Sequence, residues 1–180
     1  MKVLVGLDYL HRVKKVMHRD LKPANLLLNT QGEVKISDFG VSGELDVENG
    51  NTAKSTFVGT LVYMSPERLQ GQPYRVDSDV WALGMVLFEA ALGRLPFQKE
   101  GETAANFGFW EMIEFFDTVE VTVPAGETSP ELKDLIDKCL QKDPSARPTA
   151  ESLLKHPWLA KYEGDEKVDL KSLVAEVKKK

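Results

Sequence analysis

Cysteine is nearly absent from this sequence: of 180 residues, only Cys139 carries a thiol. One thiol excludes an internal disulfide and cannot form a zinc site by itself. Cys139 falls in a helical pattern of apolar residues, which favours a buried core thiol, the alternative being a reactive one. A buried, unoxidised thiol is typical of a reducing compartment, so we expect a cytoplasmic protein.

Long hydrophobic runs are missing as well. Residues 1–8 lack the apolar stretch of a signal peptide. The longest apolar segment, Val80–Leu92, is about seven residues short of a membrane span, and we expect it to be a helix buried on all sides. The net charge of -5 gives no general attraction to nucleic acid or to an anionic membrane. We therefore expect neither of these as a partner.

The apolar residues that are present recur mostly at helical spacing, so we expect one mainly α domain. Nothing caps the first of these segments before Met1, and we expect the chain to begin inside that helix. Proline residues mark the connections between the later segments. The expected helices cover residues 3–10, 79–92, 110–117, 131–140 and 150–155.

Two short apolar runs break the helical pattern. Leu26–Leu28 and Val34–Ile36 are joined by a polar turn at residues 29–33, which is typical of a β-hairpin. Residues 41–60 are polar and rich in Ser, Thr, Asn and Gly, and we expect a long exposed loop there. The fold class predicted is mainly α with one small hairpin.

Residues with chemical potential lie on both sides of this hairpin. Residues 18–25 read His-Arg-Asp-Leu-Lys-Pro-Ala-Asn, and Asp-Phe-Gly follows at 38–40. An antiparallel hairpin returns the chain to its start, so Asn25 and Asp38 should lie side by side. Their amide and carboxylate oxygens suit Mg²⁺ together with phosphate oxygens. Asp20 could then accept a hydroxyl proton, while Lys22 offsets charge on the transferred group.

Each piece alone has an ordinary explanation, because a lone Asp in a loop is most often a turn former. Together, in this order and at this separation, the two motifs resemble the signature set of the protein kinases. The resemblance continues at Ser65-Pro66-Glu67, at residues 77–84, at residues 143–148 and at His156-Pro157-Trp158. It covers residues 1–159 as a C-terminal kinase lobe and leaves 160–180 as a tail.

The resemblance implies a role for each matching residue. Asp20 would be the catalytic base, Lys22 would contact the transferring phosphate of ATP, and Asn25 and Asp38 would bind Mg²⁺. Leu27 would lie beneath the adenine, although an ordinary core leucine fits the sequence equally well. The remaining roles are structural or regulatory: apolar stacking for His18 and Phe39, phosphate binding for Arg19, anchoring of the catalytic loop for Asp79, and an ion pair for Glu67 and Arg147.

The segment from Phe57 to Leu69, with residues 38–43, is similar to the MAP kinase kinases, which phosphorylate Thr and Tyr of a MAP kinase. Lys22 and Thr60 resemble the serine/threonine branch, and a Ste20-like kinase is the alternative within it. Thr52 and Thr56 keep the spacing of the family's activating phosphosites, although solvated loops are commonly rich in Thr and Ser. The resemblance implies a MAP kinase substrate and an upstream MAP kinase kinase kinase.

Residues 168–174 resemble the segment on which upstream kinases dock, and an amphipathic end helix is the alternative. No Gly-x-Gly-x-x-Gly motif occurs in the 180 residues, and nothing resembles the Val-Ala-Ile-Lys strand. We therefore expect that the ATP-binding lobe is missing and that this chain alone is nearly inactive. A second hypothesis is a non-catalytic module that binds a MAP kinase or an upstream kinase. The intact Asp20, Asn25 and Asp38 favour descent from an active enzyme.

Overall fold

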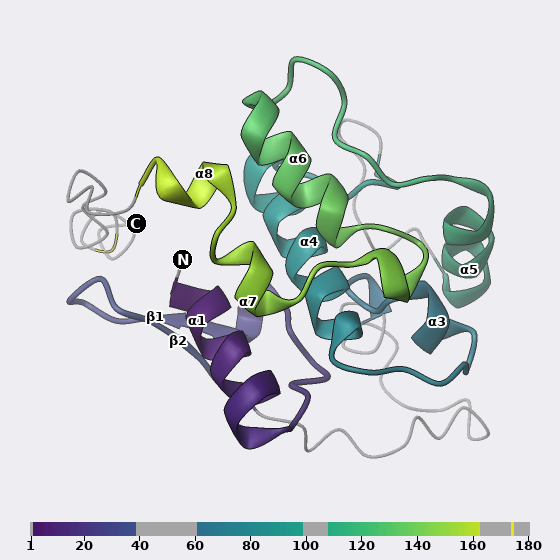
Figure 1. The fold of residues 1–180 in the computed structure, drawn as a ribbon. Helices are drawn as coiled ribbons and strands as arrows, with labels where there is room; N and C mark the ends of the chain where they lie inside the picture. The colour runs from purple at the N-terminus through teal and green to yellow at the C-terminus, as the bar shows by residue number, and fades with distance from the viewer. Residues whose placement is uncertain (1, 39–60, 99–107, 163–173, 175–180) are drawn as a thin grey trace.

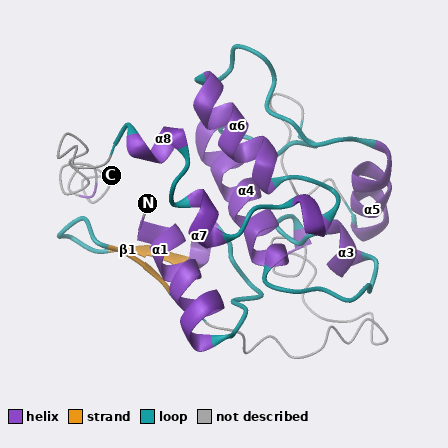
Figure 2. Ribbon diagram, in the orientation of Figure 1, coloured by secondary structure: helices purple, strands orange, loops and turns teal. Residues whose placement is uncertain are grey.

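The computed structural model describes residues 2–38, 61–98, 108–162 and 174. Helices dominate this part of the chain, and the two strands that it contains form one hairpin, so the predicted fold class is confirmed (Figures 1 and 2). The hairpin lies beside the first helix at one side of the molecule, and the later helices surround a central helix.

The first helix, α1 (Lys2–Asp8), changes its winding before it ends. It continues as a π-helical turn over Tyr9–Lys14 and stops at Lys15, whose φ of 57° is left-handed. The sequence predicted an ordinary helix here. His11 lies in this turn, and its side chain contacts Asp79, as described with the site below.

The hairpin forms at the residues predicted for it. β1 (Leu26–Leu28) pairs antiparallel with β2 (Val34–Ile36), and Leu26 lies opposite Ile36. The turn closes on Asn29, whose side-chain oxygen accepts hydrogen bonds from two backbone N–H groups of the turn. β2 packs against α1, which fixes the hairpin on the helical body.

The central helix is α4 (Asp77–Leu92), and one apolar cluster lies on each side of it. One cluster gathers around Trp81, and the other around Leu83. The expectation that α4 is buried on all sides is correct for Ser78–Val86 and wrong at the C-terminal end, where Ala90 is exposed. The last turn emerges from the core, and Gly93 ends the helix with a left-handed φ of 69°.

The other helices pack around α4. Most closely packed is α6, because Gly84 lets the backbone of α4 approach: a Cβ there would lie 2.7 Å from Cys139 Cβ. Side-chain caps start α6 at Ser129 and α7 at Thr149. These helices are α3 (Pro66–Leu69), α5 (Phe109–Thr118), α6 (Pro130–Cys139), α7 (Ala150–Leu153) and α8 (Pro157–Ala160).

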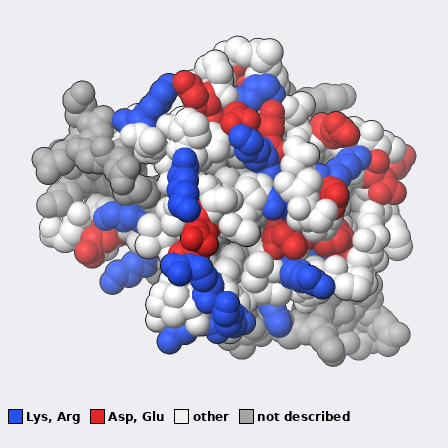
Figure 3. Space-filling model, viewed as in Figure 1, with Lys and Arg blue, Asp and Glu red and all other residues white. Residues whose placement is uncertain are grey.

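The surface carries charges of both signs. On the face shown in Figure 3, acidic and basic side chains are intermixed, and basic ones gather over the turn that follows α1. Arg12, Lys14 and Lys15 are exposed in that part of the chain. Among the described residues, no helix combines the length and apolar character needed to cross a membrane.

Candidate active site

The loop that carries Asp20 is held by one buried carboxylate. Asp79, in the first turn of α4, is 1% exposed. Its Oδ2 accepts a hydrogen bond from His18 N at 2.7 Å, and its Oδ1 accepts one from Arg19 N at 2.8 Å. Arg19 has a left-handed φ of 71°, which a non-glycine residue adopts only where its surroundings hold it. The predicted anchor residue therefore lies against the backbone of the loop.

A third contact to Asp79 comes from His11, which the sequence reasoning did not select. His11 Nε2 lies 2.8 Å from Asp79 Oδ2. The α-helical spacing of Val3, Leu4, Leu7 and Leu10 places His11 on the same face, four residues after Leu7. That pattern identifies a packed face but not the partner of a polar residue on it.

His18 has polar contacts that correct its expected role as apolar stacking. The side chain is fully buried, its Nδ1 accepts a hydrogen bond from Asp20 N at 3.3 Å, and its Nε2 lies 2.8 Å from Ser37 O. Because Nδ1 accepts, Nε2 must carry the proton and donate it to the carbonyl. His18 thus links the loop to the chain that follows β2.

The candidate base, Asp20, has two neighbours on its own loop. Lys22 Nζ lies 2.9 Å from Asp20 Oδ2. Asn25 Nδ2 donates to the same oxygen at 3.0 Å and to the backbone carbonyl of Asp20 at 2.8 Å. These contacts fix the orientation of the carboxylate. They also use the amide nitrogen of Asn25, so its amide oxygen is the atom with the chemistry to ligate a cation.

The hairpin brings Asp38 to this group. Ser37 N donates to Asn25 O at 2.9 Å, one pair beyond the strand pairing of Leu26 with Ile36. Asp38 follows with a left-handed φ of 59°, and its Oδ2 accepts a hydrogen bond from Ser37 Oγ at 3.1 Å. The backbone pairing of Asn25 with Ser37 therefore brings Asp38, the next residue, close to Asn25 along the chain path, as the sequence predicts.

The donor set at the hairpin suits Mg²⁺ bound to phosphate. No group of three or more His, Cys, Asp or Glu side chains in the described ranges could hold a metal ion. Asn25 and Asp38 provide one amide and one carboxylate for oxygen ligation. Mg²⁺ usually takes one or two protein oxygens and fills its octahedron with phosphate and water, and these residues fit that pattern.

Two positions were expected for Leu27, beneath the adenine or in the core, and the structure contradicts the second. Its side chain is 53% exposed, so the interpretation as an ordinary core leucine is wrong. Strand alternation in this two-stranded hairpin leaves the face that carries Leu27 uncovered. Phe39, Thr52, Thr56 and Thr60 lie outside the described residues, as does nearly all of the predicted docking segment at 168–174.

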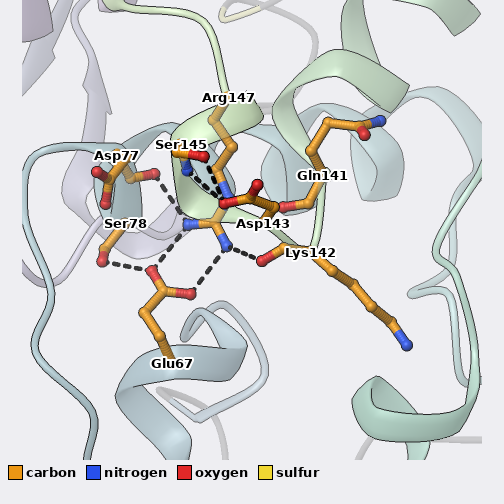
Figure 4. Close-up of polar contacts among 8 residues, drawn as sticks. All are labelled: Glu67, Asp77, Ser78, Gln141, Lys142, Asp143, Ser145 and Arg147. Carbon is orange, nitrogen blue, oxygen red and sulfur yellow. Dashed lines mark hydrogen bonds and ion pairs between the residues drawn. The ribbon is translucent and has the colours of Figure 1, made fainter.

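Glu67 and Arg147 meet 80 positions apart in the sequence (Figure 4). Arg147 Nη1 and Nη2 each lie 2.8 Å from one oxygen of Glu67, and both side chains are buried. Burial alone would raise the pKa of Glu67, but the hydrogen bonds and charge of Arg147 outweigh it and lower the pKa to about 2. Ser78, another residue not selected from the sequence, donates to Glu67 Oε1 at 2.8 Å. The pair ties α3 to the segment before α7.

Comparison with known proteins gives consistent matches. Residues 1–159 match the family model described as "Protein kinase domain". The chain is 48% identical to Mitogen-activated protein kinase kinase 3 of Arabidopsis thaliana over 98% of its own length and 32% of the relative. It is 47% identical to Mitogen-activated protein kinase kinase 1c of Physcomitrium patens, over 92% of this chain and 47% of that one.

A fungal protein gives a match of the same strength. MAP kinase kinase MKK1/SSP32 of Saccharomyces cerevisiae is 47% identical over 87% of this chain and 31% of its own length. The chain thus spans about a third to a half of the length of these curated relatives.

Proposed function

The chain belongs to the protein kinase family, and we propose that it is the C-terminal, catalytic half of a MAP kinase kinase. Such an enzyme transfers the γ-phosphate of ATP to Ser or Thr, and to Tyr, of a MAP kinase. The observation that carries the proposal is the arrangement of Asp20, Lys22 and Asn25 on one loop, with Asp38 brought beside them by the hairpin. The names of the similar plant and fungal proteins support the substrate class.

In this proposal the residues of the loop divide the work of phosphoryl transfer. Asp20, oriented by Lys22 and Asn25, accepts the proton of the substrate hydroxyl. Lys22 offsets the negative charge that develops on the transferred group. Asn25 and Asp38 hold Mg²⁺, which when bound neutralises charge on the phosphates of ATP. Leu27, exposed on β1, forms the floor under the adenine.

Regulation would act through Arg19, which is exposed and directly precedes Asp20. A guanidinium pairs bidentately with phosphate oxygens. Phosphorylation of Thr52 and Thr56 by an upstream kinase would add about -1.5 to -2 charges per site and give Arg19 a partner. Residues 160–180 would form a separate tail, with 168–174 as the docking segment for that upstream kinase.

We further propose that these 180 residues alone have little or no kinase activity. They contain no Gly-x-Gly-x-x-Gly loop to cover the phosphates of ATP. The same observation favours the second candidate function, a lobe that binds a MAP kinase or an upstream kinase without turnover. Binding of a MAP kinase by the chain does not by itself separate the two candidates. It would favour the binding lobe only if the chain also fails to catalyse phosphoryl transfer after an ATP-binding lobe has been supplied.

A chimera separates the two candidates. The chain, with Thr52→Glu and Thr56→Glu in place of the proposed activating phosphates, is joined to the region that precedes the matched segment in the 48% identical Arabidopsis protein, and incubated with magnesium-ATP and a catalytically dead MAP kinase. Phosphorylation of Thr and Tyr is followed by mass spectrometry. We expect the chimera to phosphorylate both residues, the 180-residue chain to phosphorylate neither, and Asp20→Asn to lower the rate of the chimera at least about 100-fold.

Each outcome has a meaning. A folded chimera that stays silent would contradict the catalytic proposal and leave the binding lobe. Phosphorylation of Ser and Thr of the MAP kinase, with its Tyr unmodified, would point instead to a Ste20-like kinase. Robust turnover by the 180-residue chain, lost in Asp20→Asn, would show that the proposed dependence on a second lobe is wrong.

A further inference from the structure

A cavity of about 350 Å³ lies away from the hairpin and its catalytic residues. Three segments form its wall: the end of the first helix with its π-helical turn, the start of α4, and residues 144–151. This volume falls within the range of about 300–1,000 Å³ that small-molecule sites occupy. None of the candidate catalytic residues lines it.

The wall combines an apolar surface with a few polar groups, which is the usual composition of a ligand site. Val76, Val80, Pro144, Pro148 and Ala150 supply the apolar part. Such a surface can hold the body of a small molecule. The polar groups then decide which head group that molecule carries.

The charges in the wall favour a cation. Arg147 is committed to Glu67, and Arg12 is paired with Asp8. Asp77 and Glu151 form no ion pair among the described residues. The Asp77 residue is half-buried: its fully buried Oδ1 accepts no hydrogen bond from the described residues, whereas the side chain as a whole accepts backbone hydrogen bonds from Arg75 and Ser78. Burial is the main reason that the pKa of Asp77 is raised.

We propose that this cavity binds a small amphipathic cation, an amine or guanidinium on an apolar body, with Asp77 as the residue that recognises the charge. The ammonium group of such a ligand pairs with the charge of the Asp77 carboxylate, which forms no ion pair among the described residues, and its body lies on the apolar wall. The proposal is independent of phosphoryl transfer, because it uses no catalytic residue.

Binding here would act on the site through two side chains of the wall, and through one of them on the catalytic loop itself. His11 lines the cavity, and its Nε2 contacts Asp79, which in turn accepts hydrogen bonds from His18 N and Arg19 N. Arg147, on another part of the wall, holds Glu67 of α3. A ligand in the cavity therefore touches two of the contacts that hold segments of the site in place.

The test is a titration of the ¹⁵N-labelled 180-residue chain with phenethylamine, followed by two-dimensional NMR. Phenethyl alcohol and phenylacetate serve as the neutral and anionic counterparts of the same size. We expect saturable shifts for phenethylamine with a dissociation constant on the order of 1 mM, including shifts of the His18 and Arg19 amide resonances. The alcohol should bind about tenfold more weakly, and the acid should not bind.

Variants assign the effect to the cavity. Asp77→Asn should lower the affinity for phenethylamine to that for the alcohol and leave the alcohol unchanged, whereas Glu120→Gln, an exposed acid on the loop after α5, should change neither. Val76→Trp, at a rim position 36% exposed, should weaken both by filling the cavity. Equal affinities of the amine and the alcohol, shifts that do not saturate, or an unchanged preference in folded Asp77→Asn would each overturn the proposal.

Discussion

The ion pair between Glu67 and Arg147 yields a quantitative prediction for Glu67→Gln. The substitution keeps the size of the side chain but leaves a buried guanidinium without its counter-charge, since the two side chains are 4% and 0% exposed. Removing one member of such a pair costs about 3–5 kcal/mol. Arg147 keeps its hydrogen bonds to the carbonyls of Gln141 and Lys142. We therefore expect a loss of about 3 kcal/mol in the free energy of unfolding, the lower end of that range.

The pH dependence gives a second route to the same number. The pKa of Glu67 falls from 4.5 to about 2 in the folded state. A carboxyl with a lowered folded-state pKa stabilises the protein above pH 4.5, and this contribution is lost as the pH falls from about 4.5 to about 2. At about 1.4 kcal/mol per unit of pKa difference, the contribution is again about 3 kcal/mol.

Urea unfolding, followed by tryptophan fluorescence between pH 7 and pH 3, measures both effects. Glu67→Gln should lose the stabilisation at pH 7 and show a flatter decline below pH 4.5, while Glu120→Gln should behave as the unmodified chain. If Glu67→Gln alone does not fold, the double variant Glu67→Gln/Arg147→Met, which removes both charges, should restore folding. A loss below about 1 kcal/mol, the value of an exposed salt bridge, with unchanged pH dependence would refute the reasoning.

Three further predictions follow from the packing and from the loop anchor. Gly84→Ala places a Cβ 2.7 Å from Cys139 Cβ and 2.8 Å from Leu140 Cδ2. It should lower the free energy of unfolding by about 1–3 kcal/mol, measured by thermal unfolding. The control Ala90→Gly, at an exposed helical position, should cost at most about 1 kcal/mol. Burial raises the pKa of the Cys139 thiol to about 12, so Ellman's reagent should react with it at pH 8 only after denaturant is added; rapid reaction of the folded chain would contradict this. Asp79→Asn replaces one acceptor oxygen by a donor, and hydrogen exchange of the His18 and Arg19 amides should accelerate about tenfold or more, while Asp117→Asn on α5 should leave both rates unchanged.

The parts of the fold that the sequence predicts well are those with local signals. The two strands form at the residues expected because an apolar triplet flanks each side of a polar turn that Asn29 closes. The helices α5 and α6 lie within one residue of their expected ends, because the apolar residues of each recur at helical spacing. The spacing of Asn25 and Asp38 likewise follows from the hairpin.

Contacts between distant segments were beyond local reasoning. The sequence shows that α4 is apolar but not where its last turn leaves the core, because that depends on which elements cover Ala90. The apolar Leu27 does not reveal that its face of the hairpin is uncovered. The contact of His11 with Asp79 spans 68 positions, so no local pattern reveals it. The cavity at Asp77 arises from three separate segments.

The two ends of the hairpin have different neighbours. Asn25 and Ser37 pair at its open end, next to the candidate catalytic loop, while residues 29–33 close the opposite end with their own hydrogen bonds. Turn type and loop length set the register of a hairpin, so this turn also helps to fix the position of Asp38. For protein engineering, an insertion in the turn is therefore expected to act on the catalytic loop from the far end of the hairpin, by shifting the register that brings Asp38 to Asn25.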